Sequence, residues 1–325
     1  MANPTDVHAH YCPADYRELI ASSTPGLVPR LLPDGSLVVA SQRFPPFPPG
    51  MHDLDDRLKR MDTAGLARQV LSVPPALLLY WADGPSAAAV SRRLNEAMAT
   101  AVEEHADRFL GFGSVPLQQP DLAVEELEYA VCSLGLAGVE IGANVGGRDL
   151  DDEMFRPFLA ALERLDVPAL VHPCAFVGGE RVANHSLALS LGFPFDTSIC
   201  LARLMSAGVV DAFPSLRLCF VHGGGVVPYM KGRLDHVARW EDGQDVAPSR
   251  YLERLFLDSL VLDGDALALL VRAAGPERIV IGTDWPYAIG EPDPVRAIQS
   301  NTQLPDGAAA GILGANANRF LTGRI

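Results

Sequence analysis

The stretch Asp6-Val7-His8-Ala9-His10 lies near the N-terminus and has the pattern of a short β-strand. Side chains two residues apart on a strand point to the same side, so we expect both imidazoles to face one metal ion. Two histidines do not complete a metal site, because zinc in proteins usually has four ligands. The question is whether the rest of the chain provides the missing ligands in the right places.

Short apolar segments alternate with helical patterns along the remaining sequence, which is typical of a parallel sheet covered by helices. Together with residues 6–10 they give eight strands, the number found in a (β/α)8 TIM barrel. A doubly wound open sheet is the alternative, but the first strand is not followed by the Gly-x-Gly-x-x-Gly of a dinucleotide-binding fold. We therefore predict an α/β protein built as a TIM barrel. The other predicted strands are residues 69–73, 109–115, 138–141, 169–172, 218–222, 255–259 and 279–282.

A long irregular stretch at about 11–52 follows the first predicted strand and is rich in proline and glycine. Its part from Leu31 to Ser41 has Asp34-Gly35 between apolar residues, which predicts a small β-hairpin. Loops of this length inside a compact domain are usually functional or disordered. No second-domain boundary is visible, so we expect residues 1–325 to form one barrel domain with this insertion after strand 1.

The composition bounds the function classes. The chain has 325 residues with 48% hydrophobic and 20% charged content, as in soluble globular proteins. A net charge of −14 argues against binding to nucleic acid or to anionic membranes. We find no signal peptide and no apolar run long enough to span a membrane. The five cysteines are scattered and form no CxxC pair, so we expect reduced thiols and a cytoplasmic location.

Three further polar residues stand at the C-terminal ends of predicted strands, namely His172, His222 and Asp284. Enzymes with this barrel carry their active sites at that end. A single histidine at a strand end is more often a hydrogen-bonded core residue than a ligand. The joint pattern of residues from four of the eight strands favours a metal site.

Three imidazole nitrogens and one carboxylate oxygen are typical of catalytic zinc. We assign Zn²⁺ as the cofactor, with another divalent metal such as Mn²⁺ as the alternative, and we expect His222 to act beside it as an acid or base. Because the chain's lysines, Lys59 and Lys231, lie at no strand end, a carboxylated lysine that bridges two metals is not expected and the site should be mononuclear. The assigned ligands are His8, His10, His172 and Asp284.

Several segments together resemble the amidohydrolase superfamily, in particular the branch of α-amino-β-carboxymuconate-ε-semialdehyde decarboxylase. The ordered set is specific for the branch, whereas His-x-His alone is not. The resemblance implies a metal-dependent, non-oxidative decarboxylase of an unsaturated or aromatic carboxylic acid. The segments are Asp6–His10, Leu79–Trp81, Gly138–Gly142, Leu170–Pro173, Phe213–Arg217, Phe220–Gly225, Gly232–His236 and Gly282–Pro286.

The resemblance also implies roles for individual residues. The four assigned ligands match its zinc ligands, and His222 matches its proton-transfer histidine. Arg43 matches an arginine that holds a substrate carboxylate, and Tyr287 stands where the family has an aromatic pocket wall. Trp81 is assigned to the substrate site, with packing in the core or a dimer interface as its alternative. Arg233 matches an arginine that reaches into a neighbouring subunit, which predicts a homodimer acting on a small anionic substrate.

The sequence departs from the branch in its predicted pocket. Cys174 stands where a tryptophan is usual, and Glu241 replaces a second arginine, for which Arg239 is the nearest candidate. These changes affect the choice of substrate more than the reaction type. Two other functions stay open: a hydrolase or hydratase of a lactone, amide or unsaturated acid on the same mononuclear site, and a non-catalytic binding protein. The complete ligand set argues against the latter.

Overall fold

The protein is described by a computed structural model that covers residues 3–39, 42–241 and 246–323. Within these residues, eight parallel strands form one sheet in the order β1-β5-β6-β7-β10-β11-β12-β13. Val7 N donates a hydrogen bond of 2.9 Å to Ile281 O, just after the last strand, so the sheet closes on itself. The strands are β1 Thr5–His10, β5 Arg68–Ser72, β6 Phe109–Ser114, β7 Gly138–Gly142, β10 Ala169–His172, β11 Leu218–Phe220, β12 Phe256–Asp258 and β13 Ile279–Val280.

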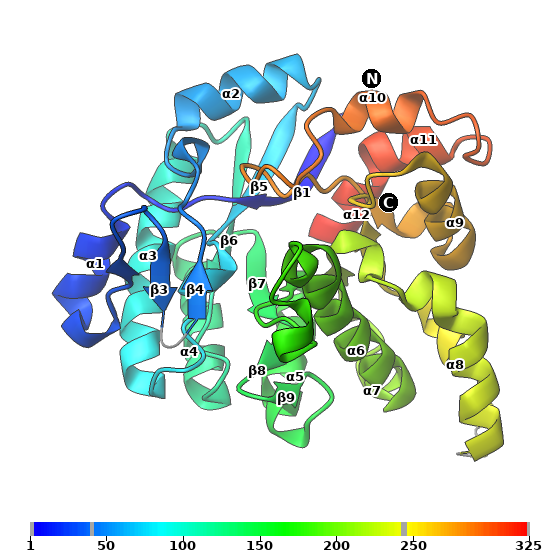
Figure 1. The fold of residues 1–325 in the computed structure, drawn as a ribbon, viewed down its shortest axis with the longest axis horizontal. Helices are drawn as coiled ribbons and strands as arrows, with labels where there is room; N and C mark the ends of the chain where they lie inside the picture. Colours follow the sequence, from blue (N-terminus) through cyan, green and yellow to red (C-terminus); the bar gives the residue numbers. More distant parts are fainter. Residues whose placement is uncertain (1–2, 40–41, 242–245, 324–325) are drawn as a thin grey trace.

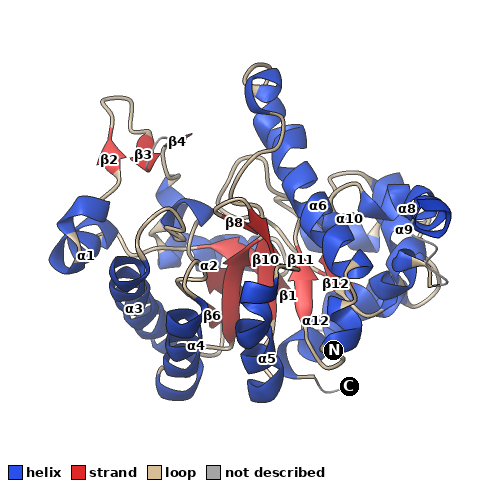
Figure 2. Cartoon of the chain, turned by 90° about the horizontal axis from the view of Figure 1, so that it is seen from below, coloured by secondary structure: helices blue, strands red, loops and turns tan. Residues whose placement is uncertain are grey.

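Helices surround this barrel on the outside (Figures 1 and 2). Three of them begin where an aspartate side chain caps the first turn: Asp53, Asp83 and Asp263 each accept a hydrogen bond from the backbone N–H three residues later. The longer helices are α2 Leu54–Thr63, α3 Gly84–Glu103, α4 Pro120–Glu128, α5 Arg156–Leu165, α6 Phe193–Ser206, α8 Val227–Glu241 and α9 Gly264–Ala274. The shorter ones are α1 Tyr16–Ser23, α7 Val209–Ala212, α10 Pro294–Gln299, α11 Ala308–Ala310 and α12 Asn316–Thr322.

The barrel interior is filled by a compact apolar cluster to which seven of the eight strands contribute. Phe320 of α12 joins it, with ring centroids 6.2 Å from Phe112 and 5.3 Å from Phe256. Side chains that alternate outward form the larger cluster between the strands and the helices. The predicted TIM barrel is therefore confirmed, and its packed interior forms a rigid base for the strand ends. The strand residues of the inner cluster are Val7, Val70, Phe112, Leu170, Cys219, Phe256 and Val280.

The insertion after strand 1 contains a small antiparallel sheet, as predicted, but with three strands instead of two (Figure 2). These are β2 Arg30–Leu31, β3 Leu37–Val39 and β4 Gln42–Phe44. Residues 40–41, which belong to the predicted hairpin, lie outside the described residues. Leu37 and Val39 are buried on one face, whereas Arg43 lies on the other face, opposite Val38. A second small hairpin, β8 Asn144–Val145 with β9 Arg148–Asp149, follows β7.

The last three strands of the barrel, β11, β12 and β13, are shorter than predicted. They end at Phe220, Asp258 and Val280, whereas the apolar pattern extends to 222, 259 and 282. The chain turns at those ends, and His222 and Asp284 have positive φ angles of 55° and 57°. No helix among the described residues combines the length and the apolar character that a membrane crossing requires.

Candidate metal centre

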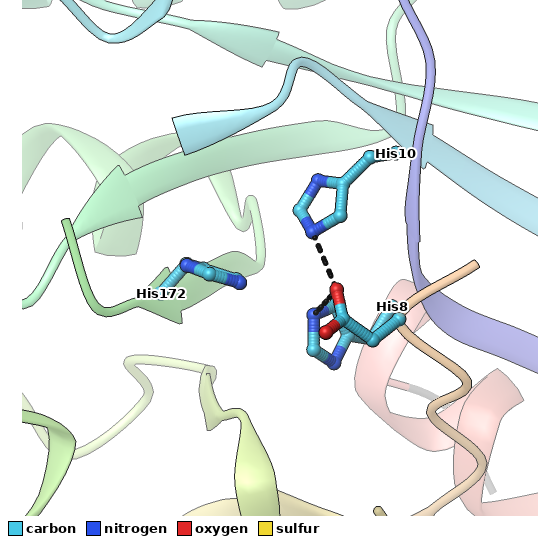
Figure 3. A group of neighbouring side chains, drawn as sticks. His8, His10 and His172 are labelled. Atoms are coloured by element: carbon cyan, nitrogen blue, oxygen red, sulfur yellow. Dashed lines mark ion pairs between the residues drawn. The ribbon is translucent and has the colours of Figure 1, made fainter. Parts of the chain in front are cut away.

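The four residues assigned as metal ligands lie together at the C-terminal end of the barrel. His8 and His10 come from β1, His172 ends β10, and Asp284 follows β13. One nitrogen or oxygen of each lies within 4.8 Å of the others. Figure 3 shows the imidazoles of His8, His10 and His172 directed toward one common region. All four residues are buried, with relative exposures between 0% and 6%.

The converging atoms lack hydrogen-bond partners. They are Nε2 of His8, His10 and His172 together with Oδ1 of Asp284. Asp284 Oδ1 lies 3.1 Å from His10 Nε2 and 3.5 Å from His8 Nε2, the two ion pairs drawn in Figure 3. Leaving buried polar atoms unsatisfied costs on the order of 1–3 kcal/mol each. A cation between them would satisfy all of them at once, so the residues present fit a metal ion.

The other ring nitrogen of each histidine faces an acceptor. His8 Nδ1 lies 2.7 Å from Asp258 Oδ2, and His172 Nδ1 lies 2.7 Å from Pro173 O. His10 Nδ1 lies 3.3 Å from Val73 O. Because an acceptor at Nδ1 holds the hydrogen on that nitrogen, the lone pair of each neutral imidazole is on Nε2. All three rings are therefore oriented as metal ligands.

Electrostatics favour a cation at the same point. Burial raises the pKa of Asp284, but the neighbouring imidazoles of His10, His222 and His8 outweigh it and hold that pKa well below the usual range. Burial and the neighbouring histidines hold the pKa of His172 well below its usual value. Burial lowers the pKa of His8, yet Asp258 and Asp284 together raise it to about 10. At neutral pH the group thus offers a carboxylate and a neutral imidazole, and it holds one proton that a metal ion would displace.

His222 lies beside the four-atom group but outside it. Its ring centroid is 5.4 Å from those of His8 and His172, and its Nε2 is 3.9 Å from Asp284 Oδ2. The side chain is 17% exposed, the most of the five residues at this site. An imidazole that adjoins a metal site and still contacts solvent can exchange protons with both. The proton-transfer role of His222 stays a prediction that this geometry suits.

The predicted substrate residues lie in different places. The Tyr287 ring centroid is 5.5 Å from that of His10, and burial raises the pKa of this phenol well above its usual value, so it stays neutral. Trp81 is 48% exposed and lines the cavity that is described below. Arg43 forms an ion pair with Asp34 on the outer face of the small sheet. Arg233 is exposed on α8. Neither arginine therefore contacts the four candidate ligand atoms, and the substrate-binding roles of both arginines stay predictions.

Buried acids that were not assigned from the sequence also lie in this region, and two of them contact the ligand histidines through their rings. Asp258 ends β12 with no exposed surface and contacts His8. Glu140 lies on β7, where its Oε2 is 3.8 Å from His10 Nδ1 and burial raises its pKa. The signal for Asp258 was present, since an acid after the apolar pair Phe256-Leu257 at a predicted strand end matches the pattern that identified Asp284. Glu140 lies within a strand, where the sequence pattern does not tell which side it faces.

A cavity of about 300 Å³ lies among β3, β4 and the segments that follow β5, β7 and β10. One lining residue, Tyr80, accepts at Oη the N–H of Gly142 at 3.0 Å, and Gly142 pairs with His172 across the sheet. Cys174, two residues after His172, donates to Asn144 O at 2.9 Å. The described lining residues are all uncharged: Val39, Phe44, Pro75, Ala76, Leu78, Leu79, Tyr80, Trp81, Asn144, Gly146, Gly147, Cys174 and Ala175.

Comparison with known proteins gives three kinds of match. Residues 5–322 match the Amidohydro_2 family, described as amidohydrolase. The 2-amino-3-carboxymuconate-6-semialdehyde decarboxylase of Dictyostelium discoideum is 33% identical over 274 residues, which cover 83% of this chain and 76% of the relative. The gamma-resorcylate decarboxylase of Rhodococcus jostii is 31% identical over 281 residues, which cover 80% of this chain and 85% of the relative. A dihydroxybenzoic acid decarboxylase from Polaromonas, solved with bound manganese and the inhibitor 2-nitroresorcinol, superposes with a TM-score of 0.81 at 23% identity, covering 100% of this chain and 98% of that one.

Proposed function

The chain belongs to the amidohydrolase family, and we propose that it is a metal-dependent, non-oxidative decarboxylase of an aromatic carboxylic acid. The match over residues 5–322 confirms the resemblance drawn from the sequence. The observation that carries the proposal is the convergence of four buried, unpartnered ligand atoms beside His222. Both curated relatives described above are decarboxylases, which supports this reaction over others that the same ligands serve.

His8, His10, His172 and Asp284 would hold one divalent cation, for which we propose Zn²⁺ with Mn²⁺ as the alternative. Three nitrogens and one carboxylate oxygen suit zinc, and a structural relative holds manganese. When bound, the cation supplies positive charge that holds the substrate carboxylate and stabilises negative charge that develops during the reaction. The chain's two lysines, Lys59 in α2 and Lys231 in α8, lie at no strand end, which supports a mononuclear site.

Non-oxidative decarboxylation exchanges a carboxylate for a hydrogen on the same carbon. The carbon–carbon bond breaks, carbon dioxide leaves, and its bonding electron pair stays on the substrate carbon. One proton must then reach that carbon, and no oxidant is consumed. We assign this proton transfer to His222, and its position beside the ligand group with some solvent contact supports the assignment. The neutral Tyr287 ring would form one wall against which the substrate is oriented.

The uncharged cavity favours an aromatic acid with a single carboxylate. The two relatives differ on this point, because 2-amino-3-carboxymuconate-6-semialdehyde carries two carboxylates and γ-resorcylate carries one. A second carboxylate in the cavity would meet no cation among the described lining residues. Arg43 is the nearest arginine in the sequence to a lining residue, Phe44, but its guanidinium is paired with Asp34 and lies on the opposite face of β4. Burying an unpaired charge is costly, so we propose a hydroxylated benzoate as the substrate class.

A matched pair of substrates tests this function. We expect metal-loaded protein to release carbon dioxide from γ-resorcylate with a kcat/KM about ten- to a hundredfold higher than from 2-hydroxyisophthalate, in which a second carboxylate replaces one of the two hydroxyl groups. Cys174→Trp, which fills the cavity, should lower the γ-resorcylate value by about tenfold or more. Cys132→Trp, at an exposed cysteine, is the matched control, and its kcat/KM for γ-resorcylate should stay within about twofold of wild type.

A preference for the dicarboxylate that is lost in Arg43→Ala would overturn the substrate class. No carbon dioxide from any acid, with turnover of a lactone or amide, would favour a hydrolase instead.

We further propose a homodimer to which Arg233 contributes across the interface. Tyr229, Arg233 and Trp240 lie on one face of α8 at spacings of four and seven residues, and the two aromatic side chains are 76% and 73% exposed. Aromatic and arginine side chains are enriched at protein interfaces, which supports a second copy of this chain as the partner. All five cysteines are free thiols, and on that basis we propose a cytoplasmic location.

A further inference from the structure

The carboxylate of Asp258 contacts a candidate metal ligand with one oxygen and the backbone near His222 with the other. Its Oδ2 lies 2.7 Å from Nδ1 of His8, one of the assigned metal ligands. Its Oδ1 accepts the N–H of Gly223 at 2.8 Å and the N–H of Leu260 at 3.2 Å. The carboxylate is fully buried. A side chain at Gly282 would place Cβ 2.5 Å from Asp258 Oδ2, so the glycine makes room for this close approach.

We propose that Asp258 is a positioning residue that fixes the tautomer of His8 and, through its other oxygen, the turn that carries His222. The proposal rests on the metal role given to His8 above. It assigns to one buried acid the alignment of a metal ligand from β1 with a proton carrier that follows β11. Neither the ligand pattern nor the family resemblance assigned a role to this residue.

The hydrogen bond between His8 and Asp258 has a defined direction. An ionised carboxylate has acceptors only, so His8 must donate from Nδ1 to Oδ2. A neutral imidazole carries one hydrogen, and placing it on Nδ1 leaves the lone pair on Nε2. His8 Nε2 is the buried atom without a hydrogen-bond partner that points toward Asp284. Asp258 thus selects the form of His8 that can bind a cation.

Asp258 also contacts the backbone turn that follows β11. His222 and Gly223 both have positive φ, at 55° and 61°, and histidine seldom adopts this conformation without support. The N–H of Gly223, the residue next to His222, is held by Asp258 Oδ1. This hydrogen bond anchors the turn to the end of β12. It thereby fixes the position of the His222 backbone, from which the imidazole extends. His222 is consequently held about 5.4 Å, between ring centroids, from the histidine that the same carboxylate orients.

An amide at position 258 separates the effect on the His8 tautomer from the effect on the turn that carries His222. In Asp258→Asn the backbone N–H groups of Gly223 and Leu260 still require an oxygen, so the side-chain oxygen should stay on their side. The NH₂ group then faces His8 Nδ1 and forces that nitrogen to accept. The hydrogen moves to Nε2, where it blocks coordination. The variant should keep its shape and lose a ligand. In Asp258→Ala the turn loses its anchor, but His8 is free to keep its hydrogen on Nδ1.

The experiment compares Zn²⁺ affinity, thermal stability and the ¹⁵N signals of the His8 ring in Zn²⁺-saturated protein, in which the metal has displaced the extra proton that His8 holds without it. We expect Zn²⁺ to bind Asp258→Asn about 10–100-fold more weakly than wild type, with the His8 hydrogen on Nε2. Asp258→Ala should bind Zn²⁺ more tightly than Asp258→Asn and yet be less stable. A merely structural role would instead make affinity follow stability, with Asp258→Ala the worse variant in both, and this result would overturn the proposal.

Asp6→Asn provides the matched control. Asp6 is another fully buried acid of the same region, and it accepts the N–H of His8 at 3.0 Å, that of Thr283 at 3.1 Å and the Gln69 amide at 2.7 Å. Those donors are not imidazole nitrogens, so this variant should lose stability and keep the His8 hydrogen on Nδ1. Unchanged His8 signals in Asp258→Asn would contradict the proposal. Because none of these readouts uses turnover, a protein that releases no carbon dioxide would refute the proposed function without affecting this result.

Discussion

Replacing His222 by asparagine is expected to lower kcat for carbon dioxide release by about 10²–10⁴-fold while Zn²⁺ affinity changes only slightly. The imidazole lies outside the four-atom ligand group, with Nε2 3.9 Å from Asp284 Oδ2, so its loss removes a proton carrier and leaves the ligands in place. Asparagine suits the site because it tolerates the positive φ of 55° at this position. The measurement is steady-state turnover of γ-resorcylate together with a Zn²⁺ titration of the same preparation.

His185→Asn is the matched control for this variant. His185 is exposed and has a φ of 59°, so the same substitution is made in the same backbone conformation away from the site. Its turnover should equal that of wild type. If His222→Asn also kept wild-type turnover, the proton would have to come from another group. If it lost Zn²⁺ instead, His222 would be a ligand and the four-residue assignment would be incomplete.

Replacing Asp284 by asparagine should weaken Zn²⁺ binding by more than a hundredfold and reduce turnover to background. Asp284 provides the one carboxylate among the proposed ligands, and its Oδ1 lies 3.1 Å from His10 Nε2. Asparagine again tolerates the φ of 57°, so the loss of negative charge is tested with little change of backbone. In wild type, Zn²⁺ at a hundred times its Kd should stabilise the fold by about 2.7 kcal/mol, and this gain should vanish in the variant.

Asp293→Asn, on the same segment after β13, controls for the loss of one negative charge. Asp293 lies 3.9 Å from Arg296 at the start of α10 and contacts no assigned ligand. Thermal unfolding with and without Zn²⁺ should show the full metal-dependent shift in this control. An equal shift in Asp284→Asn would show that the cation binds elsewhere.

The sequence was sufficient for the fold and for the grouping of the ligands, and the reason is physical. Parallel strands of a barrel end at one rim, so residues at strand ends far apart in the chain, such as His10 and His172, must meet. The apolar strand pattern placed each strand to within a few residues. It ran past the true ends at Phe220 and Val280, because a pattern of residue types does not register the left-handed conformations that follow at His222 and Asp284.

The sequence could not predict the hydrogen-bond direction at His8 or the orientation of the Arg43 side chain. The tautomer of His8 depends on Asp258, which lies 250 residues away, and only the closed barrel brings the two together. The direction of Arg43 depends on which face of β4 it occupies and on its pairing with Asp34, neither of which follows from the Pro-rich stretch around it. The neutral character of the cavity depends likewise on segments that only the fold assembles.

The most direct test of the account is carbon dioxide release by metal-free and Zn²⁺- or Mn²⁺-loaded protein in D₂O, with γ-resorcylate as substrate. The account predicts no turnover without metal. With metal, it predicts one carbon dioxide per resorcinol, and one deuterium at the carbon that carried the carboxylate, with no oxygen consumed. Carbon dioxide release that survives removal of the metal would contradict it. So would metal-loaded protein that releases no carbon dioxide from any hydroxybenzoate.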